Sequence, residues 1–299
     1  MLSRRQLLHW AAMPLLPGPL LPGKSSPVSL SIGNYGMPLL AVDRALAIIR
    51  EIGYDGAELC LMAGWPSEPA KLDAAARRRI RQQGLPIPSM IENLNLLVSE
   101  ADHASTLNRI RIAAALAHDV SPKRPPRLQS VLGGKPSEWE QVKHRMAARL
   151  ADWARVAHEN RIDLAVKSHI GSASDTPEKL IWLLDQVNSS SLSAIYDYSH
   201  FQLLDLDLQA SLETLLPRSS FVTVKDGRLV DGKPQFLLPG DGMIDYAKYF
   251  ALLKTKGYRG WMLVEISRQL QTAPGFDAIG AARRSYENLS PRLRAAGLR

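Results

Sequence analysis

The sequence predicts an α/β fold, a (β/α)8 TIM barrel in a single domain. Short β-rich runs alternate with amphipathic helical runs over residues 27–299, and barrels of this kind need about 250 residues. A helix-to-strand turn, GYDG (53–56), recurs as GYRG (257–260), as repeated units on one scaffold would. The alternative is a doubly wound open sheet. It usually carries a G-x-G-x-x-G turn after its first strand, and SIGNYGMP does not fit that pattern.

Eight β-rich runs are bounded by turn residues and predict the strands. The clearest helical runs lie between them, and in one of them apolar residues recur at three- and four-residue spacing, which predicts one buried helix face. The predicted strands are Val28–Ile32, Gly56–Leu61, Pro86–Ile91, Arg127–Leu132, Asp163–Ser168, Leu192–Tyr196, Ser220–Val224 and Trp261–Ile266, and the helices are Val42–Ile52, Glu138–Glu159, Pro177–Val187 and Tyr246–Lys256.

Composition excludes several classes of protein. The 299 residues are 45% hydrophobic and 22% charged, which suits a globular chain with a substantial core. The single cysteine, Cys60, rules out an internal disulfide, a zinc ribbon and an iron–sulfur cluster. The net charge of +8 is scattered, and the arginine run at 77–81 is interpreted as a solvated helix face. A nucleic-acid partner is therefore not expected.

The N-terminal residues 1–26 are predicted to be an export signal rather than part of the barrel. Arg4 and Arg5 form a twin-arginine pair, and an apolar stretch follows from Leu7 to Leu21. That stretch is too short and too rich in proline to span a membrane. The resemblance to the twin-arginine signal implies a periplasmic or otherwise exported bacterial protein, with residues 27–299 as the mature domain and no membrane span in it. A disordered N-terminal arm is the alternative.

Polar residues cluster where the predicted strands end, and in a TIM barrel those ends form the active face. Four histidines elsewhere on predicted helices or turns, His103, His118, His144 and His158, are interpreted as surface residues. The residues at the strand ends are Asn34, Glu58, Glu92, Lys167, His169, Asp197, His200, Lys225 and Glu265.

Residues 160–266 resemble the sugar phosphate isomerase/epimerase family of xylose-isomerase-like TIM barrels. The resemblance is carried by LAVKSHIGSASDTPEKLIWLLDQV (164–187), IYDYSHF (195–201), VTVKDG (222–227) and LPGDGMIDYAKYFALLKTKGYRGWMLVEI (238–266), and ALAIIREIGYDGAEL (45–59) fits the family's first helix and second strand. It implies an enzyme that acts on a sugar or keto-sugar by removing a proton α to a carbonyl. It also allows a homodimer.

In that family a divalent cation, Mn²⁺, Mg²⁺ or Zn²⁺, is held by Glu, Asp, His and Glu on strands five to eight. Asp197 and Glu265 stand at two of these positions, but Lys167 and Thr223 stand at the other two. A protonated lysine has no lone pair with which to bind a cation. We therefore expect a degenerate metal set, no cofactor, and the Lys167 ammonium in roughly the cation's place, paired with Asp197 and Glu265.

This substitution leaves Glu265 as the expected general base and Lys167 as the catalytic electrophile, because neighbouring carboxylates keep an ammonium protonated. His169, His200, Asp197, Lys225 and Glu58 are the expected substrate-binding residues. Lys225 would either bind an anionic group or pair with Asp226. One base suits a lyase or a one-sided isomerisation better than a symmetric epimerisation.

Four alternatives stay open. A metal-independent lyase and a non-catalytic carbohydrate-binding barrel with a decayed site both fit the loss of ligands. An endonuclease IV-like enzyme would need many more metal ligands and a basic DNA face. A glycosidase would need two carboxylates across the barrel mouth, with Glu58, Glu92 and Glu265 as candidates.

Overall fold

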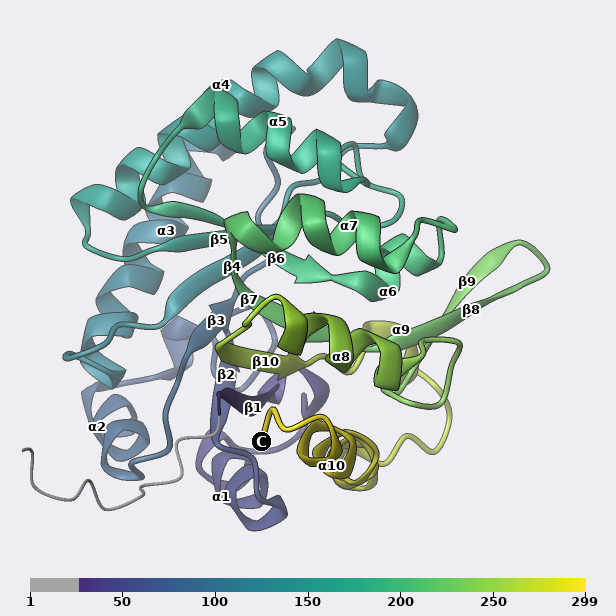
Figure 1. Cartoon of the computed structure of the whole chain (residues 1–299). Coiled ribbons are helices and arrows are strands. Elements are labelled where there is room, and N and C mark those ends of the chain that lie inside the picture. The colour runs from purple at the N-terminus through teal and green to yellow at the C-terminus, as the bar shows by residue number, and fades with distance from the viewer. Residues whose placement is uncertain (1–26) are drawn as a thin grey trace, which may run out of the picture.

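Eight parallel strands close into a barrel in the computed structural model, which describes residues 27–299. The strands follow the chain in order around the barrel, and helices surround them (Figure 1). The fold predicted from the sequence is confirmed. The predicted signal, residues 1–26, lies outside the described residues. The barrel strands are β1 (Val28–Gly33), β2 (Gly56–Cys60), β3 (Ser89–Ile91), β4 (Arg127–Val131), β5 (Leu164–Lys167), β6 (Leu192–Asp197), β7 (Ser219–Val224) and β10 (Gly260–Val264).

The helices begin and end where the sequence places caps. The helix α3 starts after Ser99, whose side chain accepts from the Asp102 N–H, and α5 starts after Thr176 in the same way. The helix α1 ends at Gly53, whose φ of 107° suits glycine. The helices are α1 (Val42–Ile52), α2 (Ala74–Gln82), α3 (Glu100–Val120), α4 (Trp139–Glu159), α5 (Pro177–Val187), α6 (Tyr198–Gln202), α7 (Leu208–Leu215), α8 (Tyr246–Thr255), α9 (Arg268–Gln271) and α10 (Ala278–Ala295).

All eight predicted strands are present, with shifted ends. The largest difference is in β3, which begins at Ser89 rather than at Pro86. Pro86 and Pro88 have no N–H to donate to a neighbouring strand, so regular pairing starts only after them. The prediction correctly placed the four clearest helices to within one residue at either end.

Two apolar cores hold the barrel together. The larger lies between the strands and the surrounding helices, where residues such as Leu30, Met90 and Trp153 are fully buried. The smaller fills the barrel interior with Ala165, Ile195, Phe221 and Leu263. Side chains alternate along a strand, so the next inward position after each of these is polar or charged. The apolar plug therefore ends below a polar layer at the carboxyl ends of the strands.

A hairpin that the sequence analysis did not predict interrupts the alternation of strands and helices after β7. Its strands, β8 (Asp226–Val230) and β9 (Lys233–Leu237), pair antiparallel and project from the barrel (Figure 1). The turn residues Asp231 and Gly232 both have positive φ, which a two-residue hairpin turn requires. The hairpin places Phe236 beside the carboxyl ends of β6 and β7.

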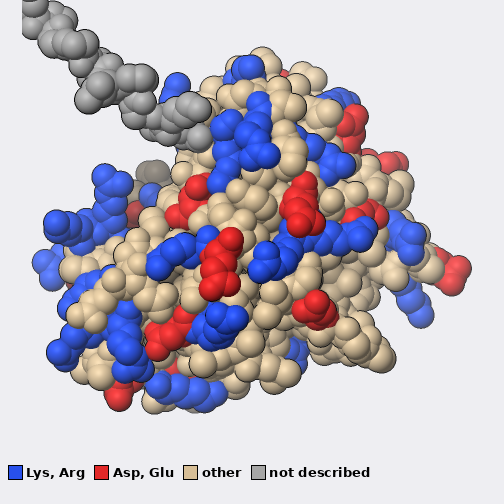
Figure 2. Space-filling model, turned by 90° about the horizontal axis from the view of Figure 1, so that it is seen from below, with Lys and Arg blue, Asp and Glu red and all other residues tan. Residues whose placement is uncertain are grey.

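Surface charge is mixed, as the sequence suggested. On the face in Figure 2, acidic side chains lie among the basic ones. In the arginine-rich helix α2, Arg77 pairs with Asp119 and Arg79 pairs with Asp43, which confirms a solvated helix face. No helix within residues 27–299 is both long and apolar enough to cross a membrane. One histidine differs from its prediction: His103 is buried, because it packs against α4 and pairs with Asp152.

Candidate active site

Four charged side chains meet at the carboxyl ends of four consecutive strands. Lys167 ends β5 and Asp197 ends β6, while Lys225 follows β7 and Glu265 follows β10. Lys167 Nζ lies 3.1 Å from Asp197 Oδ2 and 2.5 Å from Glu265 Oε2. Lys225 Nζ lies 3.1 Å from the same Asp197 oxygen and 2.6 Å from Glu265 Oε1. The pairing expected for Lys167 is present, and a second lysine shares both acids.

The two lysines differ in what they leave unpaired. Lys225 Nζ lies within hydrogen-bond distance of three side chains, Asp197, Glu265 and His200 Nε2, the last at 2.9 Å. Lys167 Nζ has two such partners, and no acceptor for its third N–H lies within residues 27–299. Lys167 also lines the cavity described below, whereas Lys225 does not. Lys167 is thus the lysine that can donate to a ligand.

Mutual attraction fixes the charge states of this cluster. Burial alone would lower the pKa of Lys167, but the adjacent Glu265 and Asp197 outweigh it and raise that pKa. Burial would raise the pKa of Glu265, but Lys167 and Lys225 outweigh it and hold that pKa well below its usual range. The pKa of Asp197 is lowered by the same two lysines. Lys167, Asp197 and Glu265 are therefore ionised near neutral pH. The formal charges of two lysines and two acids cancel.

Two histidines lie beside the cluster with ring centroids 4.1 Å apart. Burial, followed by the nearby lysines, lowers the pKa of His169 to about 4 and that of His200 well below its usual value, so both are neutral. His169 Nδ1 is 2.7 Å from the carbonyl of Ile170, and it must carry the ring proton to donate there. That leaves a lone pair on Nε2, which has no hydrogen-bond partner within the described residues.

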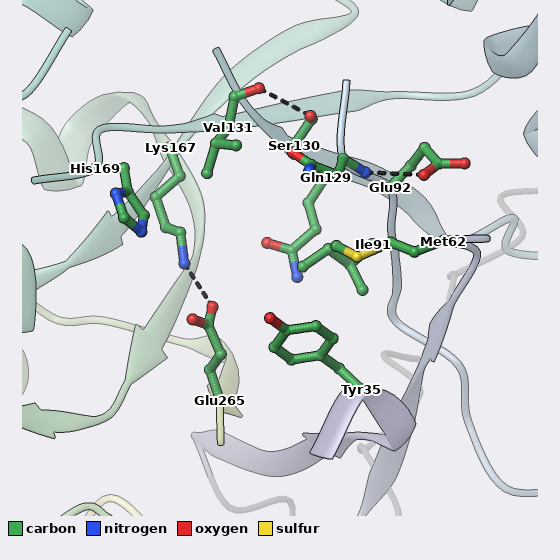
Figure 3. A pocket seen from close by; sticks show the side chains of 11 residues that line it. Tyr35, Met62, Ile91, Glu92, Gln129, Ser130, Val131, Lys167, His169 and Glu265 are labelled. Carbon is green, nitrogen blue, oxygen red and sulfur yellow. Dashed lines mark hydrogen bonds and ion pairs between the residues drawn. The ribbon is translucent and has the colours of Figure 1, made fainter. Parts of the chain in front are cut away.

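A cavity of about 190 Å³ opens beside the cluster (Figure 3). It is smaller than the ~300–1,000 Å³ of pockets for drug-sized ligands, so it suits a compact molecule. Tyr35 points its hydroxyl into it, and burial raises the pKa of that hydroxyl, which keeps its proton. Its lining is mostly polar: Tyr35, Met62, Ile91, Glu92, Asn93, Gln129, Ser130, Val131, Lys167, His169 and Glu265.

The predicted site residues fall into three groups by their position relative to the cavity. His169, Lys167 and Glu265 line the cavity, and Asp197, His200 and Lys225 support them from behind. Glu58 is buried within the barrel, where it accepts from Ser89 Oγ at 2.8 Å, and is not part of the cavity wall. A glycosidase pair that includes Glu58 is therefore not favoured. Burial raises the pKa of Glu58 to about 8.

Of the two alternatives for Lys225, the pair with Asp226 is wrong, because Lys225 pairs with Asp197 and Glu265. Asp226 instead accepts backbone N–H bonds from Gly227, Gly240 and Ile244, at 2.9, 3.0 and 3.2 Å. Lys225, which precedes Asp226, turns inward, because alternate residues of a strand face opposite sides and Lys225 is two residues after the inward-facing Thr223. That alternation was the signal that could have placed Lys225 in the cluster. Tyr35 and Gln129 had no comparable signal in the sequence.

A divalent cation does not fit the residues present. The two ammonium groups lie against the carboxylate oxygens that would bind it, and they would repel it. Thr223 stands where the resemblance expects histidine, and its buried hydroxyl has no hydrogen-bond partner among residues 27–299. No group of three or more His, Cys, Asp or Glu within residues 27–299 is arranged to hold a metal. The chemistry of this site therefore has to be sought in its side chains.

Curated relatives of this chain include inosose dehydratases from several bacteria. The one from Yersinia enterocolitica is 30% identical over 166 residues, 50% of this chain and 54% of that protein. The one from Geobacillus kaustophilus is 24% identical over 85% of this chain and 89% of that protein. For several of these relatives, such as the protein from Yersinia enterocolitica, the match spans only about half of their length.

Solved structures share the fold at low identity. A probable 3-DHS dehydratase from Bacillus anthracis superimposes with a TM-score of 0.72 at 15% identity, over 88% of this chain and 98% of that chain. A 3-keto-D-glucoside 4-epimerase from E. coli gives 0.70 at 16% identity, over 88% and 99%. Residues 46–289 match the family described as xylose isomerase-like TIM barrel. This chain therefore belongs to the xylose isomerase-like TIM barrel family.

Proposed function

We propose that the protein is a metal-independent lyase or isomerase that acts on a compact polyhydroxylated ketone, with an inosose as the first substrate to test. The family and its inosose dehydratase relatives support a sugar-like ketone. The observation that carries the proposal is Lys167, a buried ammonium with one uncommitted N–H on the wall of a small polar cavity.

The proposed reaction begins with removal of a proton from the carbon next to the ketone. As the C–H bond breaks, its electron pair forms an enolate, whose negative oxygen accepts the free N–H of Lys167. An ammonium whose pKa is raised donates a strong hydrogen bond without losing its proton. The enolate then expels the hydroxyl of the next carbon, which leaves with one added proton as water. The products are an unsaturated ketone and water.

His169 is the better candidate for the base. Glu265 was expected from the sequence, but its two ion pairs lower its pKa and make it a weak proton acceptor. His169 is neutral, and its Nε2 lone pair is uncommitted on the cavity wall. We assign Glu265 the task of holding Lys167. Tyr35, which keeps its proton, donates a hydrogen bond to the departing hydroxyl. His169 gives that hydroxyl the proton taken in the first step, so both side chains end as they began.

The test follows inosose conversion by NMR and by the ultraviolet absorbance of the unsaturated ketone, with EDTA present. Lys167→Met and His169→Gln should each lower kcat at least about 100-fold, within the 10²–10⁴ that one acid–base group or oxyanion donor contributes. His144→Gln, an exposed histidine of α4, is the matched control and should leave kcat unchanged.

Other outcomes select the alternatives. Binding of inosose without conversion, unaffected by Glu265→Gln, would favour a non-catalytic carbohydrate-binding barrel. An inosose epimerised next to its ketone, or one whose ketone has moved to the neighbouring carbon, formed without loss of water, would move the protein to the isomerase class. Activity that requires added Mn²⁺, Mg²⁺ or Zn²⁺ would refute the metal-independent mechanism.

Export is proposed separately from activity. It rests on Arg4, Arg5 and the apolar stretch that follows them. A reporter fused after residue 26 should reach the periplasm, and Arg4→Lys/Arg5→Lys should keep it in the cytoplasm. Export of the double variant at the wild-type level would refute a twin-arginine signal.

A further inference from the structure

Gln129, in β4, forms part of the cavity wall with an amide that is only half satisfied. The residue is 1% exposed, and its amide end lies in the space between Lys167, Glu265 and Tyr35 (Figure 3). Its Nε2 donates to Glu58 Oε2, while its Oε1 makes no hydrogen bond within residues 27–299. Gln129 lines the cavity, so a ligand or water there can donate to this oxygen. The wall is therefore built to accept a hydrogen bond.

Glu58 decides which end of that amide faces the cavity. Its Oε2 accepts from Ser89 Oγ at 2.8 Å as well as from Gln129. Turning the amide by half a rotation would bring Gln129 Oε1 against this oxygen, so that two acceptors would meet. This holds while Glu58 is a carboxylate. The neutral acid carries an O–H that can donate to Gln129 Oε1 in the turned amide, so the orientation is fixed above the pKa of Glu58, about 8.

The space for Glu58 is made by a glycine on the neighbouring strand. A Cβ atom at Gly33 would lie 2.9 Å from Glu58 Oε1, closer than such contacts normally come. Gly33 has an ordinary φ of −82°, so its backbone does not require glycine. The missing side chain serves to admit the Glu58 carboxyl. Three strands, β1, β2 and β4, therefore contribute to the placement of one amide.

We propose that Glu58 is a positioning residue which holds the carbonyl oxygen of Gln129 toward the cavity, and that this oxygen accepts a hydrogen bond from a ligand hydroxyl. The choice of ligand rests on the proposed function, whereas the orientation of the amide does not. A hydroxyl at this place is attracted and a carboxylate is repelled. The wall thereby selects a neutral polyhydroxylated ketone over a ketone that carries a carboxylate there.

The first experiment needs no ligand. The side-chain amide of Gln129 is followed by ¹⁵N–¹H NMR at pH 9, where Glu58 is ionised, and assigned with the variant Gln129→Met. Two distinct, slowly exchanging proton signals are expected in the wild type and in Glu58→Gln, whose amide oxygen can replace Oε2 as the acceptor. In Glu58→Met the two signals should move to the positions of a free glutamine. Unchanged signals in a folded Glu58→Met protein would overturn the positioning role.

The second experiment measures dissociation constants for inosose and for its monodeoxy analogues, each of which lacks one hydroxyl. Gln129→Met and Glu58→Met should bind inosose about tenfold more weakly than the wild type, the effect of one lost hydrogen bond. For one deoxy analogue the same variants should match the wild type. Glu58→Gln should restore inosose binding to within about twofold, and Gln141→Met, an exposed glutamine of α4, should have no effect.

The two experiments separate the possible failures. A uniform loss across inosose and every analogue would overturn hydroxyl recognition by Gln129, because no single hydroxyl would then be its partner. If the wild type neither binds nor converts inosose, the proposed function fails and the hydroxyl contact fails with it. The NMR measurement still decides the role of Glu58 by itself.

Discussion

Replacing Lys167 by methionine removes one charge from a buried, balanced cluster, and its cost can be worked out from the structure. Lys167 is 3% exposed and lies 2.5 and 3.1 Å from its two carboxylate partners. At an effective dielectric constant of ~20, each pair is worth roughly 5–7 kcal/mol before desolvation. Desolvation of the ammonium and repulsion by Lys225 offset most of this. Removing one partner of a buried pair typically costs about 3–5 kcal/mol.

The free energy of unfolding that Lys167→Met loses should depend on pH, and the two acids decide whether it grows or shrinks as pH falls. The folded-state pKa values of Asp197 and Glu265 are lowered, so their contribution to stability is present above the unfolded values near ~4 and is lost as pH falls. In Lys167→Met these pKa values rise, because only Lys225 remains to offset them. The difference in free energy of unfolding between the wild type and the variant should therefore be largest at pH 8 and should shrink as pH falls below about 5.

Urea unfolding at pH 8 and at pH 4.5 measures both quantities. The control is Lys256→Met, which breaks a 2.8 Å pair with Glu213 on the surface, where the side chains are 39% and 45% exposed. An exposed pair contributes at most about 1 kcal/mol. Equal losses in the two variants, or a Lys167→Met deficit that does not change with pH, would refute the argument from burial.

Three further predictions follow from other parts of the site. Treatment with EDTA should change neither the melting temperature nor the activity, and a fall in either that added Mn²⁺ reverses would contradict the metal-independent site. Because His169 loses its lone pair on protonation, kcat/KM should fall as pH drops through about 4. A fall of kcat/KM centred at a clearly higher pH would show that another group is the base. Gly242→Ala should destabilise the protein by at least about 1 kcal/mol in urea, since a Cβ there would lie 2.2 Å from Asp226 Oδ1; a stability equal to wild type would show that the loop adjusts freely.

The fold could be predicted because each strand is a short apolar run with its own turn residues. The cluster could be predicted in part, since Lys167, Asp197 and Glu265 all stand at strand ends within recognisable motifs. Their meeting depends on barrel closure, which brings β10 next to β7 and so carries Glu265 to residues about 70–100 positions earlier. Once the barrel is assumed, its geometry supplies the contact.

The rest could not be read from local patterns. Gln129 and Glu58 are 71 positions apart and come from strands separated by β3, so only the interior of the closed barrel joins them. The hairpin β8–β9 is an exception, because its Asp231–Gly232 turn is a local hairpin signal that the sequence analysis did not use. His103 lies on a long helix with almost no amphipathic contrast, which hid its buried side.

The self-balancing cluster of Lys167, Asp197, Lys225 and Glu265 has a consequence for how the protein matures. Because each positive group is supplied by the same polypeptide as the negative group that it neutralises, the barrel mouth is complete as soon as the strands close. We expect the newly made chain to reach its working form without a loading step, and its yield to be indifferent to which inorganic ions its surroundings hold.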